Sequence, residues 1–144
     1  MSLQEKIQTE LVAALKSKDD IKVQALRLVM AQIKDTQIEK RAPLSDEEVV
    51  RILHKLSKQH DEAIAFYRQG KREDLVNKEE TEKKIIGSFM PQALSEAEIN
   101  TVIDQVIVEV GKGNFGQVMG MVMKKIAGRA DGQVIAELVK SKLD

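Results

Sequence analysis

The sequence predicts an all-α, multihelical protein with two subdomains. Helix-forming residues dominate the 144 positions, and apolar side chains recur every three or four positions almost throughout. Serine, aspartate or asparagine stands before most of these periodic segments, where it can cap a helix. No segment alternates apolar and polar side chains over the length of a strand. We therefore expect helices alone to form the core.

The first two helices are expected before Pro43. Ser2 can cap the first helix, and either Asp19 or Asp20 can cap the second. Pro43 ends the second segment, whose apolar stripe we extend as far as Ile38. Both stripes have the three- and four-residue spacing of a helix with one packed face.

Two longer helices should follow. Ser45 and Glu48 form a capping-box pattern, and Gly70 is a plausible end for the helix that they open. A fourth helix is expected from about residue 72 to 89. Its middle, residues 77–84, contains no apolar side chain, so periodicity supports that helix less strongly.

Three shorter helices are expected after Pro91. Ser95, Asn114 and Asp131 are their candidate caps, and Gly111 ends the first of them. Six of the eight glycines and three of the six methionines follow Pro91. This shift in composition predicts a boundary near residue 93, with subdomains at residues 1–93 and 94–144.

Composition excludes several classes of protein. There is no cysteine, which rules out disulfide bonds, Cys-ligated zinc and a thiol nucleophile. Lys and Arg number 23, as do Asp and Glu, so a globally basic nucleic-acid binder is not expected. No apolar segment approaches the ~20 residues of a membrane span, and the N-terminal sequence does not resemble a secretory signal. We expect a cytoplasmic protein without membrane contact.

One stretch departs from this balance. Residues 111–130 hold four basic residues and no acid. The start of the expected helix at Asn114 adds backbone amides, which attract anions. The candidate RNA-binding residues are Lys112, Asn114, Lys124, Lys125 and Arg129. The alternative is a solvated helix face with lysines near its C-terminal end, which the helix dipole also favours.

Glycines in the same stretch invite two interpretations. Residues 111–116 match the G-x-G-x-x-G pattern of dinucleotide-binding proteins, but that motif works only after a strand, and here a helix precedes it. We interpret it as a joint between helices that needs a positive φ angle. Gly116 and Gly120 fall four apart on one helix, at a cost of up to ~1 kcal/mol each. Close approach by another helix is the commoner compensation, and close approach by a nucleic-acid backbone is the alternative.

Little in the sequence indicates catalysis or a cofactor. His54 and His60 are six residues apart, which places them on different helix faces, and we interpret them as surface or boundary residues. All carboxylates can be assigned to helix caps and solvated faces. No catalytic residue, metal site or cofactor is therefore predicted.

Several strings carry a family resemblance that covers nearly the whole chain. They are Gly70–Leu75, Lys78–Glu80, Pro91, Leu94–Ile99, Asn114–Met119, Gly128–Gly132, Leu138–Lys140 and Leu143. Together they resemble the YqeY family, and the C-terminal part is similar to the tail domain of the B subunit of aspartyl/glutamyl-tRNA amidotransferase. The resemblance implies an all-helical fold and a tRNA-contacting tail. By association it also implies carbon–nitrogen ligase activity with glutamine as amido-N-donor, although this chain lacks the amidase and kinase parts of that enzyme.

Three hypotheses of function result. The first is a stand-alone accessory module that binds tRNA weakly, with an aminoacyl-tRNA synthetase or an amidotransferase as candidate partner. The second is a component of glutamine-dependent tRNA amidotransferase activity. The third is a protein–protein adaptor that uses the face of Gly116, Gly120 and Met121 and has no role with RNA.

Overall fold

The computed structural model describes residues 1–126 and 128–144, and these residues form seven helices and no strand. The predicted all-α class is confirmed. The chain divides into two compact units, unit 1 from Met1 to Met90 and unit 2 from Pro91 to Asp144. No helix among the described residues is long and apolar enough to cross a membrane.

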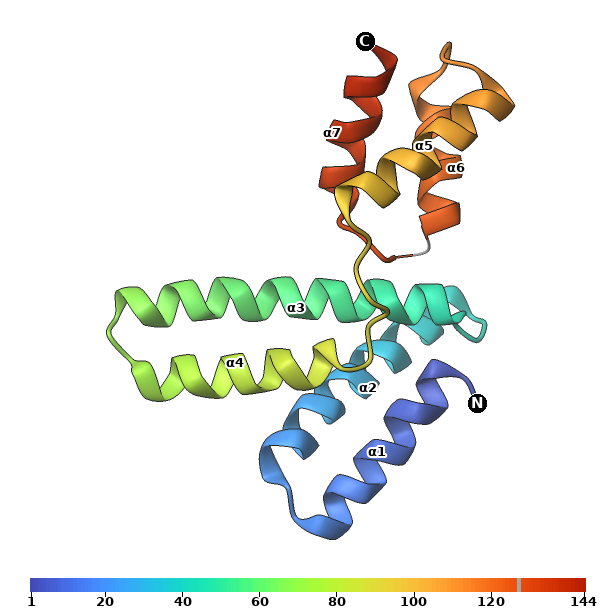
Figure 1. Cartoon of the computed structure of the whole chain (residues 1–144). Helices are drawn as coiled ribbons and strands as arrows, with labels where there is room; N and C mark the ends of the chain where they lie inside the picture. Colours follow the sequence, from blue (N-terminus) through green and yellow to red (C-terminus); the bar gives the residue numbers. More distant parts are fainter. Residues whose placement is uncertain (127) are drawn as a thin grey trace. The chain divides into compact units, whose positions relative to one another are not determined.

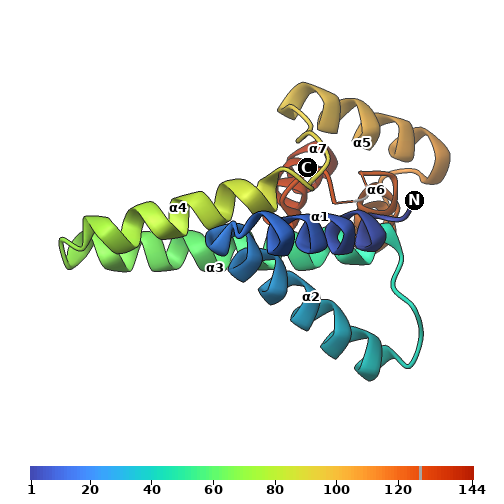
Figure 2. The same ribbon diagram turned by 90° about the horizontal axis from the view of Figure 1, so that it is seen from below.

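Unit 1 consists of two helical hairpins. The helices are α1 (Leu3–Ser17), α2 (Asp20–Lys40), α3 (Asp46–Gln69) and α4 (Glu73–Gly87). α3 and α4 lie side by side and antiparallel (Figures 1 and 2), and α2 packs against α1, α3 and α4. Fully buried side chains from α1, α2, α3 and α4, including Ile7, Leu26, Leu53 and Ile86, meet in one apolar core.

The helix starts of unit 1 follow the sequence pattern. Ser2 and Ser45 each form a complete capping box, and Asp19, rather than Asp20, caps α2 by accepting a hydrogen bond from the Lys22 amide. The extension of the apolar stripe of α2 to Ile38 was wrong. That side chain is 74% exposed, because the buried face of α2 ends at Ile33.

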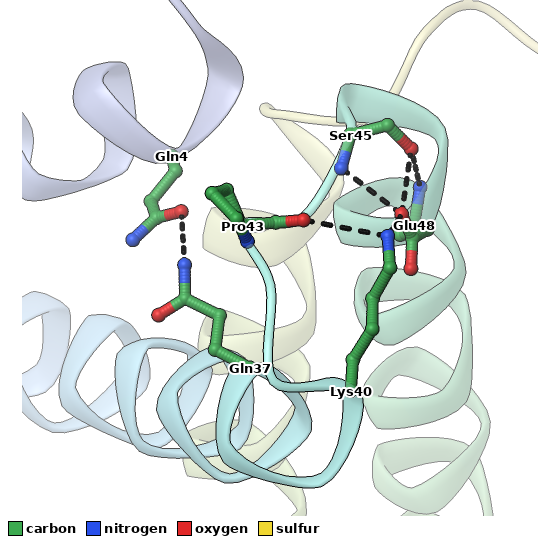
Figure 3. A network of polar contacts seen from close by, with 6 residues as sticks. All are labelled: Gln4, Gln37, Lys40, Pro43, Ser45 and Glu48. Atoms are coloured by element: carbon green, nitrogen blue, oxygen red, sulfur yellow. Dashed lines mark hydrogen bonds and ion pairs between the residues drawn. The ribbon is translucent and has the colours of Figure 1, made fainter.

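The connection from α2 to α3 is fixed by polar contacts. Glu48 accepts hydrogen bonds from the Lys40 ammonium at 2.5 Å and from the Ser45 amide at 3.1 Å (Figure 3). The hydrogen bond from Lys40, followed by that from Ser45, lowers the pKa of the Glu48 carboxyl. The Gln37 side-chain amide donates to the side-chain oxygen Oε1 of Gln4 at 3.0 Å, which ties α2 to α1.

The middle of α4 is helical although it lacks apolar side chains. Val76 and Ile86 are buried at its two ends, and Glu79 and Glu82 fall between them on the face that packs against α3. Facing them on α3 is His60, which lies on the buried stripe of that helix. The missing apolar positions of α4 are therefore taken by carboxylates that meet a histidine.

These contacts correct two predictions from the sequence. One was that His60 is a surface or boundary residue, and the other was that every carboxylate lies at a helix cap or on a solvated face. His60 is 5% exposed and Glu82 is 8% exposed, so neither is a surface or helix-cap residue. The His60 Nδ1 atom lies 2.5 Å from Glu79 Oε2 and 3.8 Å from Glu82 Oε2. Burial, and then the neighbouring charge of Glu79, raises the pKa of the Glu82 carboxyl.

Unit 2 is a three-helix unit with an apolar core. It contains α5 (Glu96–Val110), α6 (Phe115–Ile126) and α7 (Gly132–Leu143), and each of these helices packs against the other two. Ser95 and Asp131 cap α5 and α7 as predicted. The buried residues that the structure describes in this unit are all branched aliphatic: Ile99, Ile103, Val106, Val118, Val122, Ile126, Ile135 and Val139.

Candidate nucleic-acid interface

The basic stretch predicted from the sequence centres on α6 and the loop before it. Gly111 ends α5 with φ +79°, a conformation that suits glycine, so the expected positive-φ joint is confirmed at that residue. The Asn114 side-chain oxygen accepts a hydrogen bond from the Gln117 amide at 3.1 Å. Helix geometry leaves the amides of Phe115 and Gly116 without intrahelical acceptors, and both residues are exposed. The start of α6 therefore offers two N–H donors to an anion.

The joint is not a dinucleotide-binding loop. Residues 111–116 follow α5, a helix, and the described residues contain no strand from which such a loop could emerge. The G-x-G-x-x-G match is therefore coincidental, as the sequence pattern indicated.

Gly116 and Gly120 lie on an exposed face of α6. Apart from its chain neighbours and the backbone of its own helix, a methyl group added at Gly120 would meet no described atom within 4 Å, and at Gly116 it would meet only the Asn114 side chain at 3.4 Å. Packing among the described residues of unit 2 therefore does not require either glycine, contrary to the more common explanation. Lys124 continues the same face four residues further on.

The four basic residues of the stretch are not equivalent. Lys112 and Lys124 are exposed, and neither forms an ion pair with any residue that the structure describes. Lys125 pairs with Glu109 of α5 at 2.9 Å. The sequence showed no acid between residues 111 and 130, but helix packing supplies one from sixteen positions upstream, and this partly neutralises Lys125.

Arg129 has a positioning role within unit 2. Its Nε atom donates to the Gln92 carbonyl at 3.0 Å, and its own carbonyl accepts from the Leu94 amide at 2.9 Å. These bonds hold the segment that leads into α5. Hydrogen bonds from Ser95, assisted by the charge of Arg129, lower the pKa of the Glu98 carboxyl. The guanidinium is exposed, but it already interacts with the Gln92 carbonyl and with the Glu98 carboxyl.

The five predicted residues therefore form an elongated surface rather than a compact pocket. Lys112 and Asn114 stand at the start of α6, and the other three basic residues stand near its end. Twelve residues of helix separate the ends by about 18 Å. We call the exposed side of α6 that bears Gly116, Gly120 and Lys124, together with Lys112 in the loop before the helix, the α6 surface.

The protein is thus an all-helical protein of two units, and the second unit presents a basic helix face. The family model described as Yqey-like protein matches residues 4–143. The chain belongs to the YqeY family, as its sequence strings indicated.

Several relatives are named "Altered inheritance of mitochondria protein 41, mitochondrial", and some of these match over nearly the whole chain. The one from Pyrenophora tritici-repentis is 29% identical over 96% of this chain and 77% of its own length. The one from Lachancea thermotolerans is 27% identical over 95% and 76%. A protein of Thermococcus gammatolerans, named as one of the subunits of glutamyl-tRNA(Gln) amidotransferase, is 42% identical over 57 residues, which are 35% of this chain and 9% of that protein.

Proposed function

We propose that this protein is an accessory module that binds tRNA through the α6 surface. The observation that carries the proposal is the pair Lys112 and Lys124, exposed and unpaired among the described residues, beside two glycines that internal packing does not require. A phosphate backbone explains both features, because it seeks cations and can approach a helix closely only where side chains are absent.

The residues have different roles in this proposal. Lys112 and Lys124 meet different phosphates, since they stand at opposite ends of α6. The amides of Phe115 and Gly116 receive a phosphate at the helix start, which Asn114 holds in place by capping. Lys125 contributes less, because it must share its charge with Glu109.

Such a surface recognises shape and charge rather than base sequence. Phe115 is the one aromatic residue after Pro91 in the sequence, so stacking on bases is limited to a single side chain. A few phosphate contacts give weak binding with a shallow dependence on salt. The protein is therefore expected to act beside a partner that already holds tRNA, such as a synthetase or an amidotransferase.

The relatives support this proposal at a coarse level. The name of the Thermococcus protein refers to glutamyl-tRNA(Gln), and its likeness to this chain covers only a small part of that protein. Cytoplasmic localisation stays a prediction for this chain, while the names of the fungal relatives assign those proteins to mitochondria.

A fluorescence-anisotropy titration with labelled tRNA at low salt tests the proposal. The double variant Lys112→Gln/Lys124→Gln should bind about tenfold or more weakly, because each lost contact is a charge-assisted hydrogen bond. Lys140→Gln, which removes an exposed lysine from α7 of the same unit, is the matched control and should bind like the wild type. Equal affinity of the double variant and the control would reject the α6 surface and leave the protein-adaptor hypothesis.

A second candidate function is a role as a component of glutamine-dependent tRNA amidation. The likeness to part of an amidotransferase from Thermococcus gammatolerans favours it. It predicts that amidation of misacylated tRNA by the remaining components slows when this chain is omitted. An unchanged rate on omission would remove this candidate without affecting the tRNA-binding proposal.

A further inference from the structure

The interface between α3 and α4 contains a polar cluster that the RNA-binding proposal does not use. His60 comes from α3, and Glu79 and Glu82 come from α4, three residues apart and therefore on one face. The potential ligand atoms of the three side chains all lie within 4.8 Å of one another. We call these three residues the H60 cluster.

Two side chains of the H60 cluster, those of His60 and Glu82, are buried, and both have polar atoms without a hydrogen bond to any described residue. Glu82 is 8% exposed, and its carboxylate makes no hydrogen bond to any described residue. Its nearest polar neighbour is His60 Nδ1 at 3.8 Å, which is beyond hydrogen-bond reach. A buried carboxylate in that state is costly unless a cation compensates it or a proton neutralises it.

The His60 ring is oriented so that its Nδ1 atom faces the carboxylates. The Nδ1 atom lies 2.5 Å from Glu79 Oε2, whereas Nε2 is buried without a hydrogen-bond partner among the described residues. Nδ1 is therefore the ring atom that can act as a ligand, and it faces both carboxylates.

Charge also favours a divalent cation. A protonated His60 compensates one of the two carboxylates and leaves a net charge of −1 in a buried site. A divalent ion on neutral imidazole compensates both carboxylates and leaves a net charge of zero. The ion can bind His60 only through an unprotonated ring nitrogen.

We propose that the H60 cluster is a binding site for a divalent transition-metal ion, with Zn²⁺ as the best match. Zinc takes imidazole nitrogen and carboxylate oxygen together, whereas Mg²⁺ and Ca²⁺ prefer oxygen ligands alone. Zinc–ligand distances of about 2.0–2.2 Å place neighbouring tetrahedral ligands about 3.4 Å apart. The 2.5 Å contact must lengthen and the 3.8 Å contact must shorten, each by less than about 1 Å.

The site has an open side. The side chain of Glu79 is 20% exposed, compared with 6% for His60 and 10% for Glu82. Water can reach the cluster past Glu79 and complete the coordination. The bound ion would join α3 to α4 midway along their hairpin, so binding should stabilise unit 1.

Calorimetric titration of untagged, chelator-treated full-length protein with Zn²⁺ tests the proposal. The wild type should bind one ion per chain. Glu79→Gln and Glu82→Gln should each weaken binding by about tenfold or more, because loss of a direct ligand costs at least as much as loss of an outer partner. Mg²⁺ should not compete.

Two matched controls separate the H60 cluster from other zinc-binding groups on the surface. Glu80→Gln removes the adjacent carboxylate, which pairs with Arg68 outside the cluster, and His54→Gln removes the other histidine. Both should bind like the wild type. Absence of stoichiometric binding, or equal affinity in the wild type and Glu79→Gln, would overturn the proposal.

Thermal unfolding provides a second readout. Saturating Zn²⁺ should raise the melting temperature of the wild type and of both controls, but not that of Glu79→Gln or Glu82→Gln. Glu79→Gln is the safer variant, because its side chain is the most exposed of the three and its fold can be checked by circular dichroism. An equal rise in every variant would show that the ion acts elsewhere.

Discussion

The two units differ in what their packed helix faces carry. In unit 1 the face of α4 that packs against α3 bears Glu79 and Glu82 between Val76 and Ile86. In unit 2 the buried residues of α6 are all apolar, and its charged side chains are exposed. Unit 1 therefore places charge between packed helices, where we propose that an ion binds, and α6 of unit 2 places its charge on the surface, where we propose that a polyanion binds.

This difference has a physical cause. The apolar core of unit 1 draws side chains from four helices, so one polar level between α3 and α4 can be accommodated while the apolar levels hold the helices together. The helices of unit 2 have 12 to 15 residues, so each contributes only two or three buried side chains. A buried charge there would replace a large share of the core.

The largest expected effect comes from the apolar core of unit 2. Ile103→Ala should destabilise that unit by about 2–5 kcal/mol, because Ile103 is completely buried. Hydrogen exchange should show the loss of protection in α5, α6 and α7, with little change in α1 to α4. Equal loss in both units would contradict the separation into two cores.

A smaller effect of opposite sign is expected in unit 1. Glu82→Leu removes the incompletely satisfied carboxylate and makes the packed face of α4 more like that of α6. In the presence of a chelator it should stabilise the protein by about 1–3 kcal/mol, since a buried carboxylate without a hydrogen bond is replaced by an apolar side chain. Urea unfolding measures the change. A clear destabilisation would show that the contact of Glu82 with His60 contributes net stability.

The smallest expected change in stability comes from a substitution in α6 that should affect the stability of unit 2 and tRNA binding in opposite directions. Gly120→Ala should stabilise α6 by up to ~1 kcal/mol, because alanine favours the helix and the added methyl group meets no described atom within 4 Å outside its own helix backbone and chain neighbours. The same change should weaken tRNA binding, because it obstructs the approach of a phosphate backbone to the α6 surface. Stabilisation without weaker binding would mean that the glycine serves another purpose.

The sequence predicted the helices and most of their caps because these depend on neighbours within one turn. The capping boxes at Ser2, Ser45 and Ser95 are local patterns of this kind. The H60 cluster was missed because its members come from two helices. The available signal was a gap in the apolar pattern of α4, together with a histidine at an apolar position of α3.

In the basic stretch, too, the sequence did not reveal contacts between residues of different helices. Its exposed lysines follow from the position of the apolar stripe of α6, which local spacing reveals. The neutralisation of Lys125 by Glu109 does not, because it depends on how α5 packs against α6. The use of Arg129 to hold Gln92 and Leu94 is likewise a tertiary contact over 35 or more residues of sequence.

The most direct test of the central claim is the salt dependence of tRNA binding. The logarithm of the binding constant should fall linearly with the logarithm of salt concentration for the wild type. For Lys112→Gln/Lys124→Gln the slope should be shallower by about 1.4–1.8, which corresponds to two lost phosphate contacts. An unchanged slope in the double variant would contradict the assignment of tRNA binding to the α6 surface.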